Sequence, residues 1–286
     1  MEVEFIPFFT ALIGSFLAGI WDLKTTEIPD EIPYTMMLIG IIFYGIQSFV
    51  EWNYWPLFNS LLVGLCLLGF GFIMYYSGQW GGGDAKILAA IGFLLPSSNL
   101  FSTFFPFPIS YLINVFLVGA AYMILYAFIL SLMNKKILFK FFEDLKSSAN
   151  FLALGSFFLF IFLIGVNYYL INFFQLKFEL SLLIRNSLLP IFATLILFII
   201  WKFAKIVEEV GFKKRIPVKK LKVGDVLADS KLWEGITEKE LKKIKKSGKK
   251  YVEVKEGIRF GLAFPLALLF TYYFGDGLFF LIRSLI

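Results

Sequence analysis

One stretch decides the fold of this chain: Trp80-Gly81-Gly82-Gly83-Asp84-Ala85-Lys86, which directly precedes an apolar segment that continues to Leu95. From Ala85 to Leu95 the segment makes only ~16 Å of helix, at 1.5 Å per residue, and Pro96 follows it. A helix this short cannot face lipid across a whole bilayer, so we expect longer helices to surround it. The stretch therefore predicts a membrane bundle with a short helix at its centre.

The composition agrees with a membrane protein. Of the 286 residues, 59% are hydrophobic and only 17% are charged, which lies outside the range of ordinary globular domains. We predict an all-α membrane protein, a polytopic helix bundle with about eight spans, the fourth short and central, and a small α+β cytoplasmic domain. The spans are expected near 5–21, 34–50, 57–76, 85–96, 107–133, 151–173, 187–203 and 262–285.

These segments divide the chain into four predicted parts. A catalytic membrane core occupies 1–133, additional membrane helices 134–201, a basic cytoplasmic domain 202–260 and the last membrane helix 261–286. The third part carries 18 basic and nine acidic residues. Within it, the spacing of Thr237 and Glu240 is that of a capping box at the start of a short helix. Residues 221–227 and 251–254 are predicted to form strands.

The distribution of basic residues predicts the orientation. If all eight segments cross, 24 of the 27 Lys and Arg residues lie on one side, which is the cytoplasm by the positive-inside rule. The chain is thus expected in the cell membrane as a multi-pass protein, with the lipid bilayer as a partner and its N-terminus outside. Asp22 and Asp84 share the cytoplasmic face. Nucleic acid is not expected, because no aromatic and basic interleaving accompanies the charge.

The residue types present exclude several kinds of chemistry. The chain has no histidine and a single cysteine, Cys66. Catalysis by Ser-His-Asp or Cys-His and hydrolysis at a His-Glu-x-x-His zinc site therefore lack a base or a ligand. A disulfide framework and a cysteine-rich zinc site are excluded as well, and no cofactor or metal is expected. Acid-base chemistry must come from Asp, Glu, Lys or Tyr.

Asp22 ends the first predicted span. Ala11, Ser15 and Ala18 lie on the same helix face as Asp22, and such a stripe of small residues lets another backbone come close. This face, with its carboxylate, is predicted to point into the bundle. The structural alternative is a carboxylate at a helix end that meets water.

Asp84 also has a structural alternative, since an aspartate before a helix is a good N-cap. The glycines favour a site instead. Gly81, Gly82 and Gly83 lack a Cβ and are predicted to form an active-site loop that leaves room for a substrate backbone. Together, two carboxylates that share one proton can activate a water and protonate a leaving amine, as in aspartic proteases.

The element Gly81-Gly82-Gly83-Asp84-Ala85-Lys86, with Asp22-Leu23-Lys24 and Ile28-Pro29-Asp30, resembles the type IV prepilin peptidase family, most closely its archaeal preflagellin and prepilin peptidases. The resemblance implies that Asp22 and Asp84 are the catalytic pair, that the site faces the cytoplasm, and that the substrates are leaders of prepilin or preflagellin (archaellin) precursors. The four-cysteine zinc region of many bacterial relatives has no counterpart here. The length of the chain favours the prepilin peptidases of the Epp type.

Other charged residues near the aspartates are candidates for substrate or headgroup contacts: Lys24, Glu27, Asp30, Glu31 and Lys86. Because the leaders of this family are typically basic before the cut, the acidic loop after Asp22 is expected to receive their Lys or Arg residues. Asp276, within the last apolar run, is expected either to make a structural hydrogen bond or to mark a break in the helix near the interface.

Two other functions are compatible with parts of the pattern. A proton-coupled transporter would use the glycine-broken short helix for its substrate, and a non-catalytic membrane scaffold would present the basic domain to a partner. The position of both aspartates at the cytoplasmic edge favours the peptidase over the transporter.

Overall fold

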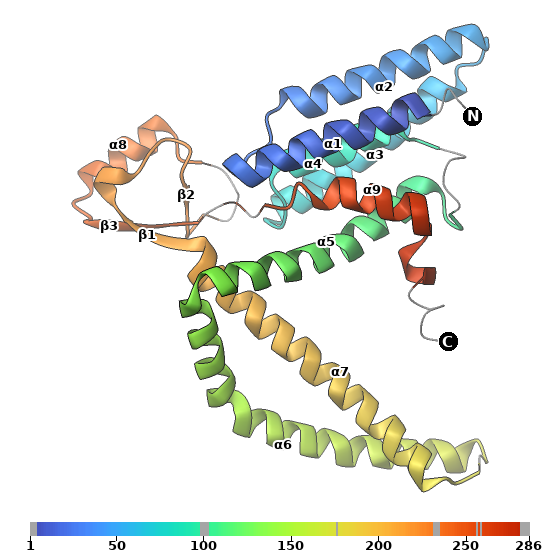
Figure 1. Cartoon of the computed structure of the whole chain (residues 1–286), viewed down its shortest axis with the longest axis vertical. Coiled ribbons are helices and arrows are strands. Elements are labelled where there is room, and N and C mark those ends of the chain that lie inside the picture. Colours follow the sequence, from blue (N-terminus) through green and yellow to red (C-terminus); the bar gives the residue numbers. More distant parts are fainter. Residues whose placement is uncertain are drawn as a thin grey trace. The chain divides into compact units, whose positions relative to one another are not determined.

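The computed structural model describes residues 5–97, 103–175, 177–230, 235–255, 257 and 259–280 (Figure 1). Helices dominate, and one small sheet lies in the basic part of the chain. In order, the elements are α1 (Phe5–Thr25), α2 (Glu31–Val50), α3 (Trp55–Tyr76), α4 (Gly82–Leu94), α5 (Phe107–Met133), α6 (Lys135–Phe173), α7 (Leu180–Ile206), a π-helical turn (Val207–Phe212), β1 (Lys213–Pro217), a 3₁₀ turn (Val218–Lys220), β2 (Val226–Leu227), α8 (Glu238–Lys246), β3 (Tyr251–Lys255) and α9 (Ala263–Phe274).

Within the described residues, six helices are long and apolar enough to cross a membrane, namely α1, α2, α3, α5, α6 and α7 with the turn after it. This confirms a polytopic helical membrane protein. Two of the eight predicted spans, near 85–96 and 262–285, fall on α4 and α9, which have 13 and 12 residues. Residues 281–285 of the last predicted span lie outside the described part. The predicted number of spans is therefore not confirmed.

The chain forms two compact units. One contains residues 1–125 together with 213–286, and the other contains residues 126–212. In the second unit α6 and α7 form a hairpin. Lys202 of α7 is buried, and its Nζ lies 2.8 Å from the Asp144 carboxylate of α6. Further along the hairpin, Asn167 donates to the Ser187 hydroxyl over 3.0 Å.

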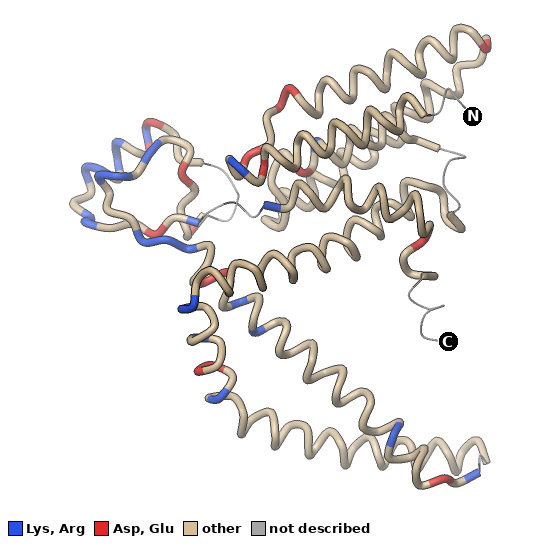
Figure 2. The backbone as a smooth tube through the Cα atoms, in the orientation of Figure 1, with Lys and Arg blue, Asp and Glu red and all other residues tan. Residues whose placement is uncertain are grey.

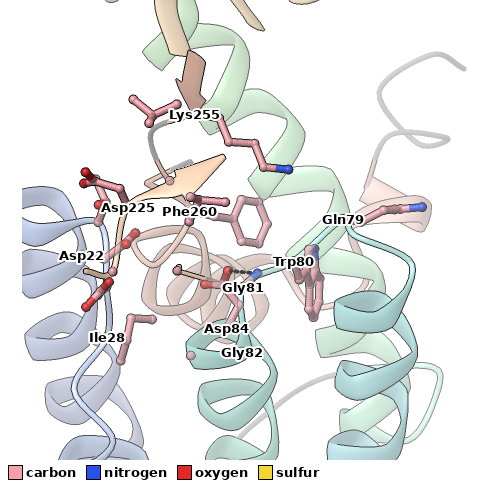
Figure 3. A pocket seen from close by; sticks show the side chains of 18 of the residues that line it. Asp22, Ile28, Gln79, Trp80, Gly81, Gly82, Asp84, Asp225, Lys255 and Phe260 are labelled. Carbon is pink, nitrogen blue, oxygen red and sulfur yellow. Dashed lines mark hydrogen bonds between the residues drawn. The ribbon is translucent and has the colours of Figure 1, made fainter. Parts of the chain in front are cut away.

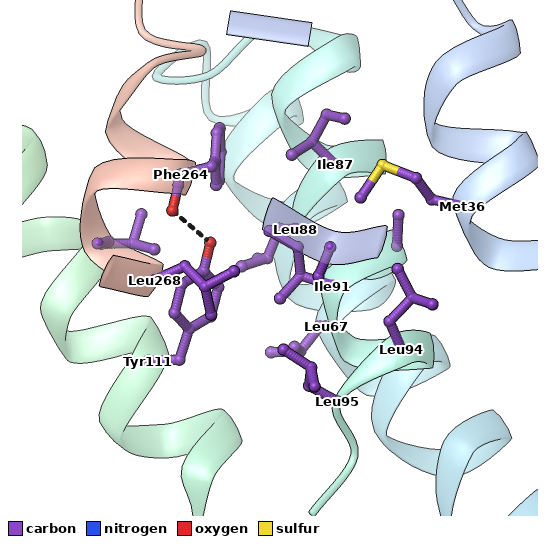
Figure 4. Close-up of a cluster of buried hydrophobic side chains, with 14 of the residues drawn as sticks. Met36, Leu67, Ile87, Leu88, Ile91, Leu94, Leu95, Tyr111, Phe264 and Leu268 are labelled. Atoms are coloured by element: carbon purple, nitrogen blue, oxygen red, sulfur yellow. Dashed lines mark hydrogen bonds between the residues drawn. The ribbon is translucent and has the colours of Figure 1, made fainter. Parts of the chain in front are cut away.

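Helix α4 forms the centre of the first unit. Every residue from Ile87 to Leu94 is buried, and the apolar side chains pack among residues of α2, α3, α5 and α9 (Figure 4). A Cβ on Gly71 of α3 would lie 2.8 Å from Ala85, so α3 and α4 approach as closely as two backbones allow. The prediction that longer helices surround the short one is confirmed for α2, α3 and α5, whereas the fourth neighbour, α9, is as short as α4 itself.

Helix α9 packs against α1 in the opposite direction. Leu262 lies against Gly19 near one end of the pair, and the rings of Tyr272 and Phe8 are 5.1 Å apart near the other. The predicted inward face of α1 is confirmed, because Ala11, Ser15 and Ala18 are fully buried.

Residues 213–255, here called the basic module, contain a three-stranded antiparallel sheet in the order β1-β3-β2. Leu241 and Ile244 of α8 pack on a small core around Val254 of β3. As predicted from the sequence, Thr237 and Glu240 form a capping box at the start of α8. Of the segment 221–227 only β2 is a strand, and the strand β1 was not predicted.

Candidate active site

Asp22 lies in the last turn of α1 with only 4% of its surface exposed. The backbone N–H of Gly261, just before α9, donates to Asp22 Oδ2 over 2.8 Å. A Cβ on Gly261 would lie 3.0 Å from the Asp22 Cβ and 3.1 Å from Oδ2. The missing side chain at 261 therefore permits the amide to reach the carboxylate, which is held inside the bundle and not at a water-exposed helix end.

Asp84 is the third residue of α4 and is also buried. Its Oδ2 accepts a hydrogen bond from the Gly81 N–H over 3.0 Å, so it helps to cap the helix from within the first turn. Gly82 and Gly83 belong to this turn and not to the predicted loop, because the helix begins two residues before Asp84. The carboxylate thus has a structural bond and still lines a cavity.

The three glycines have different surroundings. A Cβ on Gly83 would lie 2.8 Å from the Ile28 Cβ, so this position requires glycine for a close approach. Cβ atoms on Gly81 and Gly82 would meet nothing closer than 3.3 Å and 3.8 Å. All three glycines line the cavity, and the atom nearest to a Cβ on Gly81 would be Asp84 Oδ2 itself.

Asp22 and Asp84 line one cavity of about 890 Å³. Figure 3 shows the two residues on neighbouring helices, with side chains of the basic module in the same view. The module contributes Lys214, Lys222 and Asp225, among others, to the wall. The cavity is therefore built by the helical bundle and the basic module together, which gives it both apolar and charged walls.

Burial raises the pKa of the Asp84 carboxyl to about 8, and the negative charge of Asp22 contributes to the same direction. The hydrogen bond from Gly81 opposes these two effects. Asp84 lies on the first turn of α4, outside the six long apolar helices. The raised pKa favours the protonated form of Asp84, so the site can hold one proton next to a second carboxyl group.

Aromatic rings form one side of the cavity. Trp80, which directly precedes the glycines, is stacked on Phe116 of α5 with ring centroids 5.7 Å apart. Phe260 lies against the same indole at 5.8 Å. Trp80 and Phe260 directly precede Gly81 and Gly261, so their contact holds together the two segments whose amides bind the carboxylates.

The other predicted site residues do not all lie at this cavity. Glu27 lines it. Lys86 Nζ lies 2.6 Å from Asp30 Oδ1, so these two residues bind each other. Glu31 lines a separate apolar groove of about 730 Å³ between α1 and α2, and Lys24 is exposed at the end of α1.

Asp276 lies away from this cavity and is buried. Its two oxygens accept hydrogen bonds from the Ser110 hydroxyl and the Phe104 N–H. Next to it, the Asn114 side chain donates to the Gly275 carbonyl over 2.8 Å and accepts from the Gly277 N–H over 2.9 Å. The structural hydrogen bond predicted for Asp276 is confirmed.

Sequence reasoning missed the segment that enters α9. Gly257, Phe260 and Gly261 line the cavity or bind its carboxylate, and Arg259 Nε donates to the Leu23 carbonyl over 2.9 Å. The available signal was a pair of glycines on either side of a basic and an aromatic residue, directly before the last apolar run. No group of three or more Cys, Asp or Glu residues suited to a metal ion occurs among the described residues.

Comparisons with known proteins single out the same part of the chain. The model of the type IV leader peptidase family matches residues 9–132, which include Asp22 and Asp84. The chain is 26% identical to prepilin peptidase EppA of Methanothermobacter thermautotrophicus over 140 residues, which cover 45% of this chain and 36% of that protein. It is 34% identical over 95 residues to the preflagellin peptidase of Methanocaldococcus jannaschii, covering 33% of this chain and 40% of that protein.

The preflagellin peptidase of Methanococcus voltae is 34% identical over 92 residues, covering 32% of this chain and 39% of that protein. The chain thus spans about two fifths of the length of these relatives. The resemblance predicted from Asp22 and from the Gly81–Asp84 element is confirmed: residues 9–132 are similar to the type IV leader peptidase family, in the branch that includes archaeal prepilin and preflagellin peptidases.

Proposed function

We propose that this protein is an integral-membrane aspartic endopeptidase that removes the N-terminal leader of type IV pilin-like or archaellin precursors, with Asp22 and Asp84 as its catalytic pair. One observation carries the proposal. Two buried carboxylates from different helices face a single cavity, within the segment that matches the type IV leader peptidase family.

The chemistry needs only these two groups and water. Asp22, as the ionised partner, takes a proton from a water molecule. At the same time the oxygen of that water molecule bonds to the peptide carbonyl carbon. Asp84 gives its proton to the carbonyl oxygen. In the second step the carbon–nitrogen bond breaks, the departing amine receives the proton held by Asp22, and Asp84 recovers its own from the collapsing intermediate.

The active site is proposed to face the cytoplasm, with the N-terminus outside. Among the described residues of the first unit, Lys and Arg gather in the basic module and at the end of the bundle where α1 terminates (Figure 2). By the positive-inside rule this end is cytoplasmic. The basic module then covers the active site from the cytoplasmic side, and its lysines lie within reach of lipid headgroups.

The site accepts a peptide at the edge of the membrane. Asp22 ends a long apolar helix and Asp84 begins a short one, so both carboxylates lie at helix termini. A substrate whose leader precedes an apolar helix can place the scissile bond here while its helix stays in lipid. Cleavage is therefore expected just on the cytoplasmic side of that helix and not within it.

Co-expression with an archaeal prepilin and with an archaellin precursor tests the proposal. Wild type is expected to release the leader, and Asp22→Asn and Asp84→Asn to release none. Asp229→Asn, on the exposed surface of the basic module, is the matched control. Cleavage by either active-site variant would exclude the pair, and no cleavage of several precursors by wild type would favour a transporter or a scaffold. The better of the two precursors identifies the preferred substrate.

A further inference from the structure

A short loop, residues 26–30, connects the helix of Asp22 to α2. Thr26 adopts a left-handed conformation with φ of 62°, and its N–H donates to the Asp22 carbonyl over 2.8 Å. This bond closes the last turn of α1 and starts the loop only four residues after Asp22. Any constraint on the loop is therefore transmitted to the end of α1 over about one helical turn.

The loop is attached to the start of α4 at two points. Ile28 packs against Gly83 so closely that glycine is required there. Two residues further along the loop, Asp30 binds the Lys86 ammonium over 2.6 Å. Asp84 lies between Gly83 and Lys86 in sequence, so the two attachments lie on either side of the second carboxylate.

Lys86 is well placed for this contact. It is the only charged residue of α4 after Asp84, and 20% of its side chain is exposed. Its ammonium also lies over the Tyr34 ring of α2, 5.4 Å from the ring centroid, which orients a cation. A flexible lysine at a lipid interface would otherwise point into water or toward headgroups.

We propose that Asp30 and Lys86 are a positioning pair that fastens the start of α4 to the end of α1 and so sets the spacing of Asp22 and Asp84. The inference rests on the proposed function, since the spacing matters for catalysis by the two carboxylates. The pair touches neither carboxylate and acts through the loop and the first turn of α4. The pair is therefore expected to affect the cleavage rate by aligning the two reacting carboxyl groups.

Steady-state cleavage of a leader-bearing precursor by the full chain in liposomes tests this. Lys86→Met and Asp30→Asn are each expected to lower kcat about fivefold with KM within about twofold, the size expected of one partly exposed ion pair. The double variant is expected to lose about fivefold as well, because both changes break the same contact. Lys86→Arg keeps the pair and is expected to retain wild-type kcat.

Two surface variants serve as controls for loss of charge: Glu51→Gln at the far end of α2 and Lys239→Met on α8. Losses in the single variants that multiply to about 25-fold in the double would overturn the proposal. So would equal losses in Lys86→Met and Lys86→Arg.

Hydrogen exchange gives a readout that needs no substrate. Peptides covering residues 26–34 are expected to take up deuterium faster in Lys86→Met and Asp30→Asn than in wild type or Glu51→Gln. Unchanged exchange would show that the pair does not hold the loop. If wild type cleaves no precursor while exchange responds as expected, the proposed function fails and the fastening of the loop stands.

Discussion

Two buried aspartate sites in the helical bundle differ in what their oxygens face. Both carboxylate oxygens of Asp276 accept hydrogen bonds, one from the Ser110 hydroxyl and one from the Phe104 N–H. Asp22 and Asp84 each accept one backbone N–H and face a shared cavity. Burial is common to both sites, so burial alone does not mark catalysis. A buried carboxylate that keeps an oxygen directed to open space is the better indicator of chemistry.

Replacing Asp84 or Asp276 by asparagine is expected to give the largest difference in cleavage rate between the two sites. Asp84→Asn removes the group that gives and recovers the proton, and its cleavage rate is expected to fall by about a thousandfold or more. Asp276→Asn is expected to retain cleavage within about twofold per folded molecule. Rates of leader release, normalised to folded protein in liposomes, measure both.

Asp276 is expected to contribute more to the stability of the fold than to cleavage. Asp276→Ala removes the acceptor of the partly exposed Phe104 N–H and one of two acceptors of the Ser110 hydroxyl, which also donates to the Phe105 carbonyl over 3.2 Å. The change is expected to lower the free energy of unfolding by about 1 kcal/mol. A comparable loss of cleavage in Asp276 and Asp84 variants would remove the distinction between the two sites.

Gly261→Ala addresses the amide that holds Asp22. The new methyl would lie within 3.1 Å of the carboxylate, and displacing a catalytic group by a fraction of an ångström is expected to lower kcat by about tenfold to a hundredfold. Gly45→Ala on α2 is the matched control, because its Cβ would meet nothing within 4 Å. Full activity in Gly261→Ala would show that Asp22 does not depend on this contact.

The pKa of Asp84 makes stability depend on pH. Because the folded-state pKa of about 8 exceeds the ordinary value of 3.8, the folded protein keeps a proton that the unfolded chain releases. The stabilising contribution is complete below pH ~4 and is lost as pH rises toward 8. Asp84→Asn is expected to have a Tm several degrees above wild type at pH 8, and thermal unfolding in one detergent from pH 5 to 9 measures it. A difference in Tm that does not change with pH would contradict the raised pKa.

The smallest expected effect concerns the rim of the cavity. Glu27→Lys is expected to raise KM about threefold to fivefold for leaders with Lys or Arg before the cut, and less for neutralised leaders, since one exposed charge contact contributes little. Glu31→Lys, in the groove outside the cavity, is expected to have a weaker effect. Equal changes for basic and neutral leaders would exclude charge recognition by Glu27.

Local patterns sufficed for part of the site. The stripe ending at Asp22 and the glycines before Asp84 each follow from a helical period or a motif, and Pro96 marked α4 as short. The partners of these residues could not be predicted, because Gly261 lies 239 positions from Asp22 and the Lys86 contact joins residues 56 apart. Such pairings depend on how helices pack, which a local pattern does not encode.

The burial of α4 has a consequence for how the protein is assembled. A helix of 13 residues is too short to be held in a bilayer by its own length, and its residues from Ile87 onward contact protein and not lipid. During biosynthesis α4 can therefore settle only when α2, α3 and α9 are present around it. Because Gly261, directly before α9, binds Asp22, the cavity shared by Asp22 and Asp84 is complete only after α9 has packed, and under the proposed function a partly inserted chain would be inactive.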